Sequence, residues 1–514
     1  MVSAPIPPLA SALLQRIAAG RPSFRQAAVG STGRRRIKLK TVVRLPRMPR
    51  IAVVSTVASA PKGAEKELAA PDTLEKNVDK IAVLGLWHQG IVGAACLSKL
   101  GYSITAADSK VENIERLRSG ESPIYEPGLD DLISEGLAAG NLAFTSNPVE
   151  AVRDADAIFI MFDTPVDDDD NVVVDEIFDT VQEISGAIKD GAKVHITSQV
   201  PVGTCRKIIE LLERAPASDV GVSYSPENLA LGKAIETFFN PRLPMIGADS
   251  RDTYDAIAAV FRSFHPDWDF VGIETAEMSK HALNSYLATS VCFGNELGRI
   301  CDEVGADGHT IAMALRSEPR VGPKAMILPG LAFSGGTLAR DVQTLRRIAA
   351  GCDLAVPMLD SIIVSNAKHN AIILRKLNNH FGRIDALKVL VLGLTYKPDT
   401  STLRRSAAVD IVNDLVGAGA VVACSDPKAD QSEVAARFQD NASVAFSRDP
   451  FEAAEGASAV VLMTPWGDYG SLDFGRLGAL MTDDRLVIDP FEMWDRTALE
   501  GAGYAYRTIG KGYK

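Results

Sequence analysis

A glycine turn between two short apolar runs constrains the fold of this chain more than any other feature. Residues 80–86 read KIAVLGL, the turn continues as WHQG, and a helical pattern, IVGAACLSKLGY, follows. A second apolar run, SITAA, ends on Asp108. Strand, glycine turn, helix, strand and acid, with about 20 residues between the turn and the acid, form a unit that binds a dinucleotide. In that unit the helix N-terminus faces the pyrophosphate, and the acid hydrogen-bonds the adenosine ribose.

The acid and the glycines indicate which cofactor binds. Asp108 disfavours a 2′-phosphate, so we expect NAD rather than NADP. Gly85 and Gly90 occupy the outer positions of the pattern G-x-G-x-x-G, whereas its middle position is Trp87. Because the middle glycine normally lets the backbone approach the pyrophosphate, Trp87 has to point its side chain away, or the cofactor binds differently.

Apolar runs and helical patterns keep alternating, which predicts an α/β fold with two doubly wound Rossmann-like domains joined by a long central helix. Further strands are expected near residues 154–165, 193–204, 220–232, 243–248 and 270, and a second series runs from 387 to a last strand at 485–490. Ligands bind at the carboxyl ends of such strands. The polar strand exits are therefore candidate sites: Asp163-Thr164, Ser198-Gln199, Ser225-Pro226-Glu227, and Gly393 with Lys397.

The central helix is expected over residues 274–304, which contain no helix breaker beyond isolated glycines. Lys280 and Asn284 are four residues apart and share a face of it. His281 is expected to be an ordinary helix residue on another face. A long helix between two α/β halves is also a natural dimer surface, and its candidate packing residues are Leu283, Leu287, Val291 and Leu297.

The charge of the chain is unevenly distributed. The net charge of the 514 residues is −11, so nucleic acid is not the expected partner of the folded body. Residues 1–64 nevertheless contain twelve Lys and Arg and no Asp or Glu. An Arg-rich, acid-free start is typical of an organellar transit peptide, which predicts a plastid or mitochondrial location and otherwise a cytoplasmic one. A disordered basic tail is the alternative.

Cysteine usage and hydropathy exclude other classes. The six cysteines are scattered, with no CxxC and no histidine cluster, which argues against disulfides and against a metal site. No apolar run reaches the 18 or more residues that a membrane span needs.

The loop at 320–341, RVGPKAMILPGLAFSGGTLARD, has small residues between charged ends. Its glycines let backbone N–H groups approach a ligand, although Gly and Ser also dominate ordinary turns.

From Lys80 onward the chain resembles the nucleotide-sugar 6-dehydrogenases of the UDP-glucose and GDP-mannose dehydrogenase type. The motifs that carry the resemblance are, in chain order, YEPGL, VPVGT, SPENL, EMSKHALNSYLA, EPRVGPK, GLTYKPDT, SDP and TPW. This family oxidises the 6-hydroxymethyl group of a sugar nucleotide twice with NAD, which gives the uronate. The expected ligand is therefore UDP-glucose or another nucleotide sugar, and we expect a homodimer or a higher homo-oligomer.

The resemblance also implies roles for single residues. Lys280 is similar to the lysine that stabilises the alkoxide and oxyanion, and Asn284 to the residue that orients water. Asp341 is similar to the aspartate that holds the catalytic water, and Glu227 to a glutamate used in hydrolysing the acyl intermediate. The expected cofactor-binding residues are Gly85, Trp87, Gly90, Asp108, Thr164 and Gln199, and the expected substrate-binding residues are Arg320, Lys324, Phe333, Gly335 and Lys397.

One departure from the family affects the chemistry directly. Thr337 stands where the family has its nucleophilic cysteine, and none of the six cysteines lies in residues 320–341. A threonine hydroxyl has a far higher pKa than a thiol, so the route through a thiohemiacetal and a thioester is lost. In addition, Gln199 replaces a threonine and Asp163 replaces a glycine.

Three hypotheses follow. The first is an NAD-dependent dehydrogenase of a nucleotide sugar that performs one oxidation. The second is a full oxidation to the uronate in which water attacks a hydrated aldehyde. The third is a pseudoenzyme that binds a nucleotide or nucleotide sugar and has a structural or regulatory role. The predicted domains are a disordered, transit-like extension at 1–77, an NAD-binding domain at 78–273, a central helical dimerisation region with the active-site loop at 274–380, and a nucleotide-sugar-binding domain at 381–514.

Overall fold

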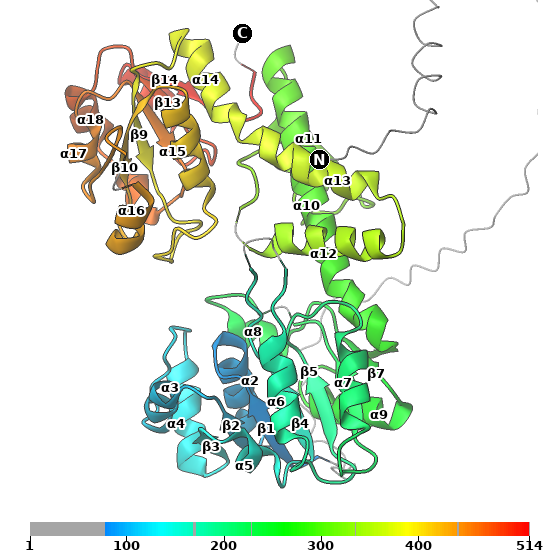
Figure 1. Ribbon diagram of the computed structural model, residues 1–514. Helices are drawn as coiled ribbons and strands as arrows, with labels where there is room; N and C mark the ends of the chain where they lie inside the picture. Colours follow the sequence, from blue (N-terminus) through cyan, green and yellow to red (C-terminus); the bar gives the residue numbers. More distant parts are fainter. Residues whose placement is uncertain (1–77, 168–170, 228, 335, 439–440, 513–514) are drawn as a thin grey trace, which may run out of the picture. The chain divides into compact units, whose positions relative to one another are not determined.

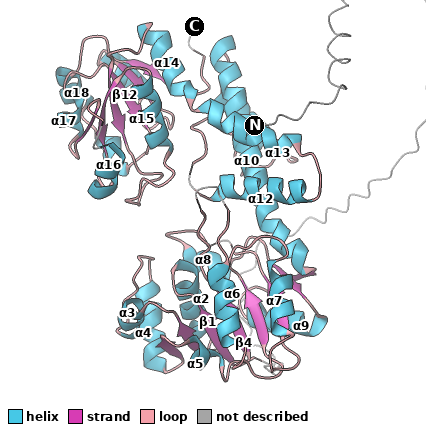
Figure 2. Ribbon diagram, in the orientation of Figure 1, coloured by secondary structure: helices cyan, strands magenta, loops and turns pink. Residues whose placement is uncertain are grey.

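The computed structural model describes residues 78–167, 171–227, 229–334, 336–438 and 441–512 (Figure 1). The extension predicted for residues 1–77 lies outside the described residues. Two sheets with helices on their faces, and a group of helices between them in the sequence, make up the described part (Figure 2). The α/β class with two Rossmann-like sheets and a long central helix is confirmed.

The first sheet has eight strands in the order β3-β2-β1-β4-β5-β6-β7-β8. Its strands pair in parallel, except that β7 runs antiparallel to β6. Residues of β1 alternate between two cores, because Ile81 and Val83 pack on one face of the sheet and Ala82 and Leu84 on the other. A strand buried on both faces is continuously apolar, as KIAVL is. The strands are β1 (Lys80–Leu84), β2 (Ser103–Ala107), β3 (Leu142–Thr145), β4 (Ala157–Ile160), β5 (Lys193–Ile196), β6 (Gly221–Tyr224), β7 (Met245–Ala248) and β8 (Asp269–Val271).

The strand order reverses between β1 and β4, which is where a doubly wound sheet binds its ligand. The helices that connect these strands are α2 (His88–Lys99), α3 (Val111–Arg118), α4 (Leu129–Ala139), α5 (Pro148–Val152), α6 (Asp175–Ile184), α7 (Thr204–Leu212), α8 (Ala234–Phe239) and α9 (Arg251–Arg262).

The predicted central helix is α10 (Ile273–Val304), which ends at Gly305 in the left-handed conformation. Helices α11 (Gly308–Arg316), α12 (Thr337–Gly351), α13 (Pro357–His369) and α14 (Ala371–Phe381) follow. Helix α10 packs against α12, α13 and β7, so it joins the first sheet to the loop that precedes α12. That loop is thereby brought close to the carboxyl ends of the strands.

The second sheet has six parallel strands in the order β11-β10-β9-β12-β13-β14. The strands are β9 (Lys388–Leu392), β10 (Val421–Ser425), β11 (Val444–Phe446), β12 (Ala459–Leu462), β13 (Leu486–Ile488) and β14 (Ala505–Arg507), and the helices are α15 (Ala407–Gly417), α16 (Gln431–Phe438), α17 (Pro450–Ala454), the 3₁₀ helix η1 (Gly467–Ser471), α18 (Phe474–Leu480) and α19 (Arg496–Gly501).

The prediction that residues 485–490 form the last strand is wrong. Strand β14 follows and pairs in parallel with β13. It is three residues long, has only one buried residue, Tyr506, and ends on Arg507, so it lacks the apolar run that marks the other strands.

Candidate active site

The glycine turn after β1 has the geometry that a bound pyrophosphate requires. Gly85 has a φ of +90°, and a Cβ there would lie 2.7 Å from the ring of Phe162. A Cβ on Gly90 would lie 1.8 Å from the carbonyl oxygen of Gly85. Both glycines therefore allow the start of α2 to sit directly on the turn, which directs the N-terminus of the helix to the end of the sheet. This turn fits NAD.

Asp108, which follows the neighbouring strand β2, is hydrogen-bonded to the glycine turn. Its carboxylate accepts hydrogen bonds from the backbone N–H of Leu86 at 2.7 Å and of Lys110 at 2.9 Å. The side chain of Trp87 is 45% exposed, and its ring lies 5.7 Å from the Lys110 ammonium group. The indole therefore lies near Lys110, in the segment that follows β2. The contacts of these residues with NAD stay predictions.

The centre of the candidate site is Asp341, which is fully buried in the first turns of α12. Its Oδ1 accepts hydrogen bonds from His281 Nδ1 at 2.8 Å and from Gln199 Nε2 at 2.6 Å. Its Oδ2 accepts a hydrogen bond from Asn284 Nδ2. Burial raises the pKa of Asp341, but these donors and the charge of Arg340 outweigh burial and hold the pKa below its usual range.

Three of the predicted residues thus meet at one point. Asn284 and Asp341 were predicted as catalytic residues and lie in contact. Gln199, predicted to bind the cofactor, donates to Asp341 and accepts a hydrogen bond from Arg340, and its contact with the cofactor stays a prediction. Thr164 Oγ1 donates to the carbonyl oxygen of Gln199 at 2.8 Å, which joins the exits of β4 and β5.

The prediction that His281 is an ordinary residue on another face of the helix is wrong. Its ring is fully buried and bonds to Asp341 through Nδ1 and to the carbonyl oxygen of Val200 through Nε2, at 3.0 Å. Residues three apart share a helix face as well as residues four apart, so His281 lies beside Asn284. That spacing is the signal in the sequence that indicates the shared face, but it does not indicate the contact with Asp341.

Lys280 lies on the side of this network that faces the exit of β6. Its Nζ donates to the carbonyl oxygen of Glu227 at 2.7 Å. Burial lowers the pKa of Lys280, while the charges of Glu227 and Asp341 act in the opposite direction. A buried lysine of this kind can stabilise a developing oxyanion or exchange a proton near neutral pH.

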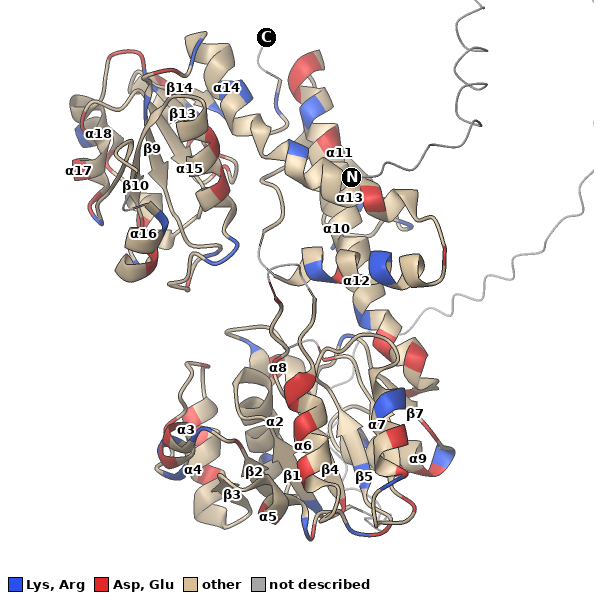
Figure 3. Ribbon diagram, in the orientation of Figure 1, with Lys and Arg blue, Asp and Glu red and all other residues tan. Residues whose placement is uncertain are grey.

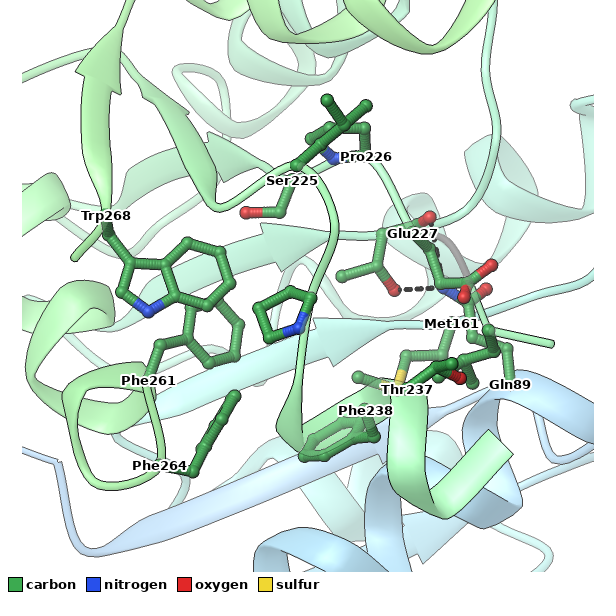
Figure 4. Close-up of a pocket in the computed structure, with 14 residues that line it drawn as sticks. Gln89, Met161, Ser225, Pro226, Glu227, Thr237, Phe238, Phe261, Phe264 and Trp268 are labelled. Atoms are coloured by element: carbon green, nitrogen blue, oxygen red, sulfur yellow. Dashed lines mark hydrogen bonds between the residues drawn. The ribbon is translucent and has the colours of Figure 1, made fainter. Parts of the chain in front are cut away.

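Glu227 stands at the edge of an apolar cavity of ≈ 70 Å³ (Figure 4). Phe238, Phe261, Phe264 and Trp268 line the cavity, and two of its polar lining residues, Gln89 and Thr197, are hydrogen-bonded to each other. The buried Oε1 of Glu227 has no hydrogen-bond partner. Burial therefore raises the pKa of Glu227 to about 7, against the opposing charge of Lys280. A carboxyl group with that pKa can both take and give a proton at neutral pH.

Thr337 is the first residue of α12 and is exposed. No cysteine side chain is suited to replace the missing thiolate. Burial raises the pKa of Cys292 to about 11 and that of Cys96 and Cys424 to about 12, and it also raises the pKa values of Cys205 and Cys301. Cys352 is exposed, but it follows the last residue of α12 and stands fifteen residues after Thr337. A nucleophilic thiolate is therefore not available at the start of this helix.

The loop before Thr337 is held by amide side chains that the sequence analysis did not single out. Asn366 of α13 bonds to both the N–H and the carbonyl oxygen of Phe333, each at 2.9 Å. Asn295 of α10 accepts from the N–H of Gly330 and donates to the carbonyl oxygen of Leu331. Phe333 also packs against a small core between α10 and α13. Gly335, predicted to bind substrate, lies outside the described residues.

The other residues that were predicted to bind substrate are not part of the hydrogen-bond network around Asp341. Arg320 is exposed and pairs with Glu318 at 3.0 Å, and Lys324 is exposed in the same segment. Lys397 is half-buried beyond β9, with its ammonium group 5.5 Å from the ring of Tyr396. Their substrate contacts stay predictions.

The motifs of the second sheet are joined by one buried carboxylate. Asp426 of SDP accepts from the N–H groups of Leu394 and Thr395, which belong to GLTYKP, and from Trp466 Nε1 of TPW. Gly393 has a φ of +89°, and a Cβ there would lie 2.4 Å from Thr464. These residues therefore shape the carboxyl end of the second sheet.

Charges around the start of α12 are mostly positive, whereas α6 carries acidic residues (Figure 3). A pocket of ≈ 330 Å³ opens beside Thr337, and the residues that line it include Arg340, Arg404, Arg405 and Tyr396.

Among the residues that the structure describes, no group of three or more His, Cys, Asp or Glu side chains gathers as in a metal site. Within the same residues, no helix has the length and apolar character of a membrane-spanning helix.

Comparisons with known proteins match most of the chain. The UDP-glucose/GDP-mannose dehydrogenase family is matched by its NAD binding domain at residues 79–265, its central domain at 274–368 and its UDP binding domain at 390–496. The chain is 32% identical to a UDP-glucose 6-dehydrogenase of Rhizobium meliloti, over 84% of this chain and 99% of that protein. It is 30% identical to a GDP-mannose 6-dehydrogenase of Pseudomonas syringae, over 69% of this chain and 82% of that protein.

A solved structure is similar along nearly its whole length. The UDP-glucose dehydrogenase of Pyrobaculum islandicum is 26% identical and superimposes with a TM-score of 0.74. The match covers 85% of this chain and 99% of that one. The fold, the glycine turn and the lysine–carboxylate site together define an NAD-dependent oxidoreductase. The chain belongs to the UDP-glucose/GDP-mannose dehydrogenase family. The reading as a non-catalytic pseudoenzyme is not favoured by these comparisons.

Proposed function

We propose that this protein oxidises the 6-hydroxymethyl group of a UDP-sugar, with UDP-glucose as the first substrate to test, and that it stops after one two-electron oxidation. Three relatives or structures named above act on UDP-glucose or GDP-mannose, and the UDP binding domain of the family is present. The positive pocket beside Thr337 supports the binding of a diphosphate, because Arg340, Arg404 and Arg405 line it.

The residues of the site can perform the first oxidation. Bound NAD supplies the hydride acceptor. Lys280 stabilises the alkoxide that forms at the substrate hydroxyl, and Glu227, with a pKa of about 7, can accept the proton that leaves. Asp341 and Asn284 hold the polar side of the site in place.

The observation that carries the limit to one oxidation is Thr337. The second oxidation through a thioester requires a thiolate, and Thr337 presents a hydroxyl at the start of α12. A full oxidation to the uronate by attack of water on the aldehyde is the second candidate, because Asp341 and Asn284, the residues expected to hold and orient that water, are both present and in contact.

The experiment counts electrons and identifies the product. Purified protein is incubated with limiting UDP-glucose and excess NAD, and both NADH and the sugar product are measured. One NADH per sugar together with an aldehyde supports the proposal. Two NADH per sugar together with a uronate supports the second candidate and contradicts the first. Parallel incubations with GDP-mannose and UDP-N-acetyl sugars identify the preferred substrate, and a lack of NADH with all of them contradicts both candidates.

We also propose a homodimer formed through α10. Three large apolar residues of this helix are more than half exposed and regularly spaced: Tyr286 at 66%, Phe293 at 54% and Ile300 at 59%. They are seven residues apart, so they form one line along the helix. The packing residues expected from the sequence, such as Leu283 and Leu287, are half-buried instead.

An organellar location is a separate proposal, supported by the acid-free, Arg-rich composition of residues 1–64. Residues 1–77 fused to a fluorescent protein should direct it to plastids or mitochondria. Diffuse cytoplasmic fluorescence would contradict the proposal.

A further inference from the structure

The hydrogen bonds of His281 determine where its protons lie. Nε2 is 3.0 Å from the carbonyl oxygen of Val200, which can only accept, so Nε2 carries a hydrogen atom. Nδ1 is 2.8 Å from Oδ1 of Asp341. Neutral imidazole has one N–H group, so Nδ1 either accepts from a protonated Asp341 or carries a second hydrogen atom on a charged ring.

The other partners of Asp341 decide between these two states. Gln199 and Asn284 donate to its two oxygens, and Nε of Arg340 lies 3.6 Å from Oδ1. All of these groups stabilise the ionised carboxylate, which has no hydrogen to give. An ionised Asp341 therefore requires that Nδ1 donates as well, and the two fully buried side chains then form an ion pair.

We propose that His281 is a positioning residue that stays an imidazolium beside the Asp341 carboxylate. The net charge of this pair is zero, so the pair does not cancel the positive charge that Lys280 and Arg340 direct at the reacting carbon. This inference rests on the proposed function, in which an alkoxide forms at that carbon. It assigns to His281 a role in the electrostatics of the site without contact with the substrate.

The charges that face the pair make this role necessary. Helix α12 contributes Arg340 next to Asp341, and Lys280 interacts electrostatically with both. From α10, Glu277 is also buried, but it accepts hydrogen bonds from the N–H groups of Gly203 and Cys205 at the start of α7. From β6, the hydroxyl group of Tyr224 stays neutral because burial raises its pKa well above the usual value. Without a positive His281, Asp341 would offset one of the two cations that stabilise an oxyanion.

The first test needs no enzymatic turnover. The chain has seven histidines, so long-range ¹H–¹⁵N spectra of the full-length protein with labelled histidine can report each ring. At pH 9 we expect one ring with hydrogen on both nitrogens, and its signal should be absent in His281→Gln or, if that variant does not fold, in His281→Asn. The matched control is His195→Phe, which removes another fully buried histidine and should leave the signal in place. Seven neutral rings at pH 9 would overturn the proposal.

The second test measures the effect on the neighbouring lysine. In His281→Gln, the uncompensated charge of Asp341 should move the basic limb of the pH profile of kcat/KM, where protonated Lys280 is lost, upward by about one pH unit, because an opposite charge raises the pKa of a lysine. The double variant His281→Gln/Asp341→Asn removes both charges and should return the limb to within about 0.3 units of wild type. A limb that does not move in His281→Gln, with kcat reduced only in proportion to the folded fraction, would show a merely structural role and overturn the proposal. A charged His281 in a protein that forms no NADH would instead contradict the proposed function, so the two failures are distinguishable.

Discussion

At the scale of single residues, Thr337 decides how far the reaction proceeds. It lies exposed at the first position of α12, where a cysteine would gain acidity from the helix N-terminus. We therefore expect Thr337→Cys to form a thiohemiacetal and to raise the yield from about one toward about two NADH per sugar, with uronate as the product. Product analysis by mass spectrometry measures this change.

Thr337→Ser is the matched control for that substitution. It retains a hydroxyl group and removes the β-branch, so it should still give one NADH per sugar. Uronate formation by Thr337→Ser, or by the wild type, would show that the thiol is not what limits the reaction.

Gly90 tests the glycine turn. A Cβ at this position would overlap the carbonyl oxygen of Gly85 at 1.8 Å, so backbone has to move. We expect Gly90→Ala to cost about 1–3 kcal/mol in stability and to abolish NAD binding in calorimetry. Gly186→Ala meets nothing within 4 Å and should leave both properties unchanged. Normal NAD affinity in Gly90→Ala would mean that the start of α2 does not contact the pyrophosphate.

At the scale of the helices and loops, the order of the site depends on how the loop before α12 is held. Asn366 satisfies both backbone polar groups of Phe333 from α13. Each such bond contributes about 1 kcal/mol, and unpaired groups cost more. We expect Asn366→Ala to lower kcat/KM about tenfold, because Thr337 and Asp341 follow directly on this loop. Asn378→Ala, on the exposed side of α14, is the control. Equal kcat/KM in the two variants would show that α12 is positioned without the loop.

The sequence predicted the elements better than the contacts among them. Runs such as KIAVL are buried on both faces, so their apolar character identifies the strands, and the glycine turn predicted the first β-α-β unit. Strand β14 was missed because three residues that end on Arg507 give no such run. The role of His281 was missed because only the fold brings Asp341 to α10, over 60 positions of sequence. The spacing of three residues to Asn284 indicated only that the two side chains share a face.

At the scale of the whole molecule, a buried histidine makes stability depend on pH. His195 lies in the core of the first sheet between Phe159 and Phe261, and its Nε2 has no partner. Burial lowers its pKa from 6.5 to about 3. Below pH 6.5 the unfolded chain takes up a proton that the folded protein does not, so stability falls as pH falls from 6.5 toward 3.

His195→Phe should therefore remove part of this acid sensitivity, on the order of 4 kcal/mol at the low end of the range. Urea unfolding at pH 7 and at pH 4.5 measures it, and the loss of stability between these two values should be smaller in the variant. An unchanged difference would mean that other groups, such as the ion pairs, set the acid limit.

The assembly of the molecule can be tested on the line of residues that α10 exposes. Single exposed apolar residues are common on protein surfaces, but Tyr286, Phe293 and Ile300 are large, more than half exposed and aligned. In a dimer the central residue would be buried, and an unpaired carboxylate there would be costly. We therefore expect Phe293→Glu to give a monomer in light scattering at concentrations where the wild type is a dimer. Val111→Glu places the same charge at an equally exposed position of α3 and should leave the dimer intact. If Phe293→Glu remains a dimer with unchanged concentration dependence, the interface lies on another surface, and the aligned residues of α10 require a different partner.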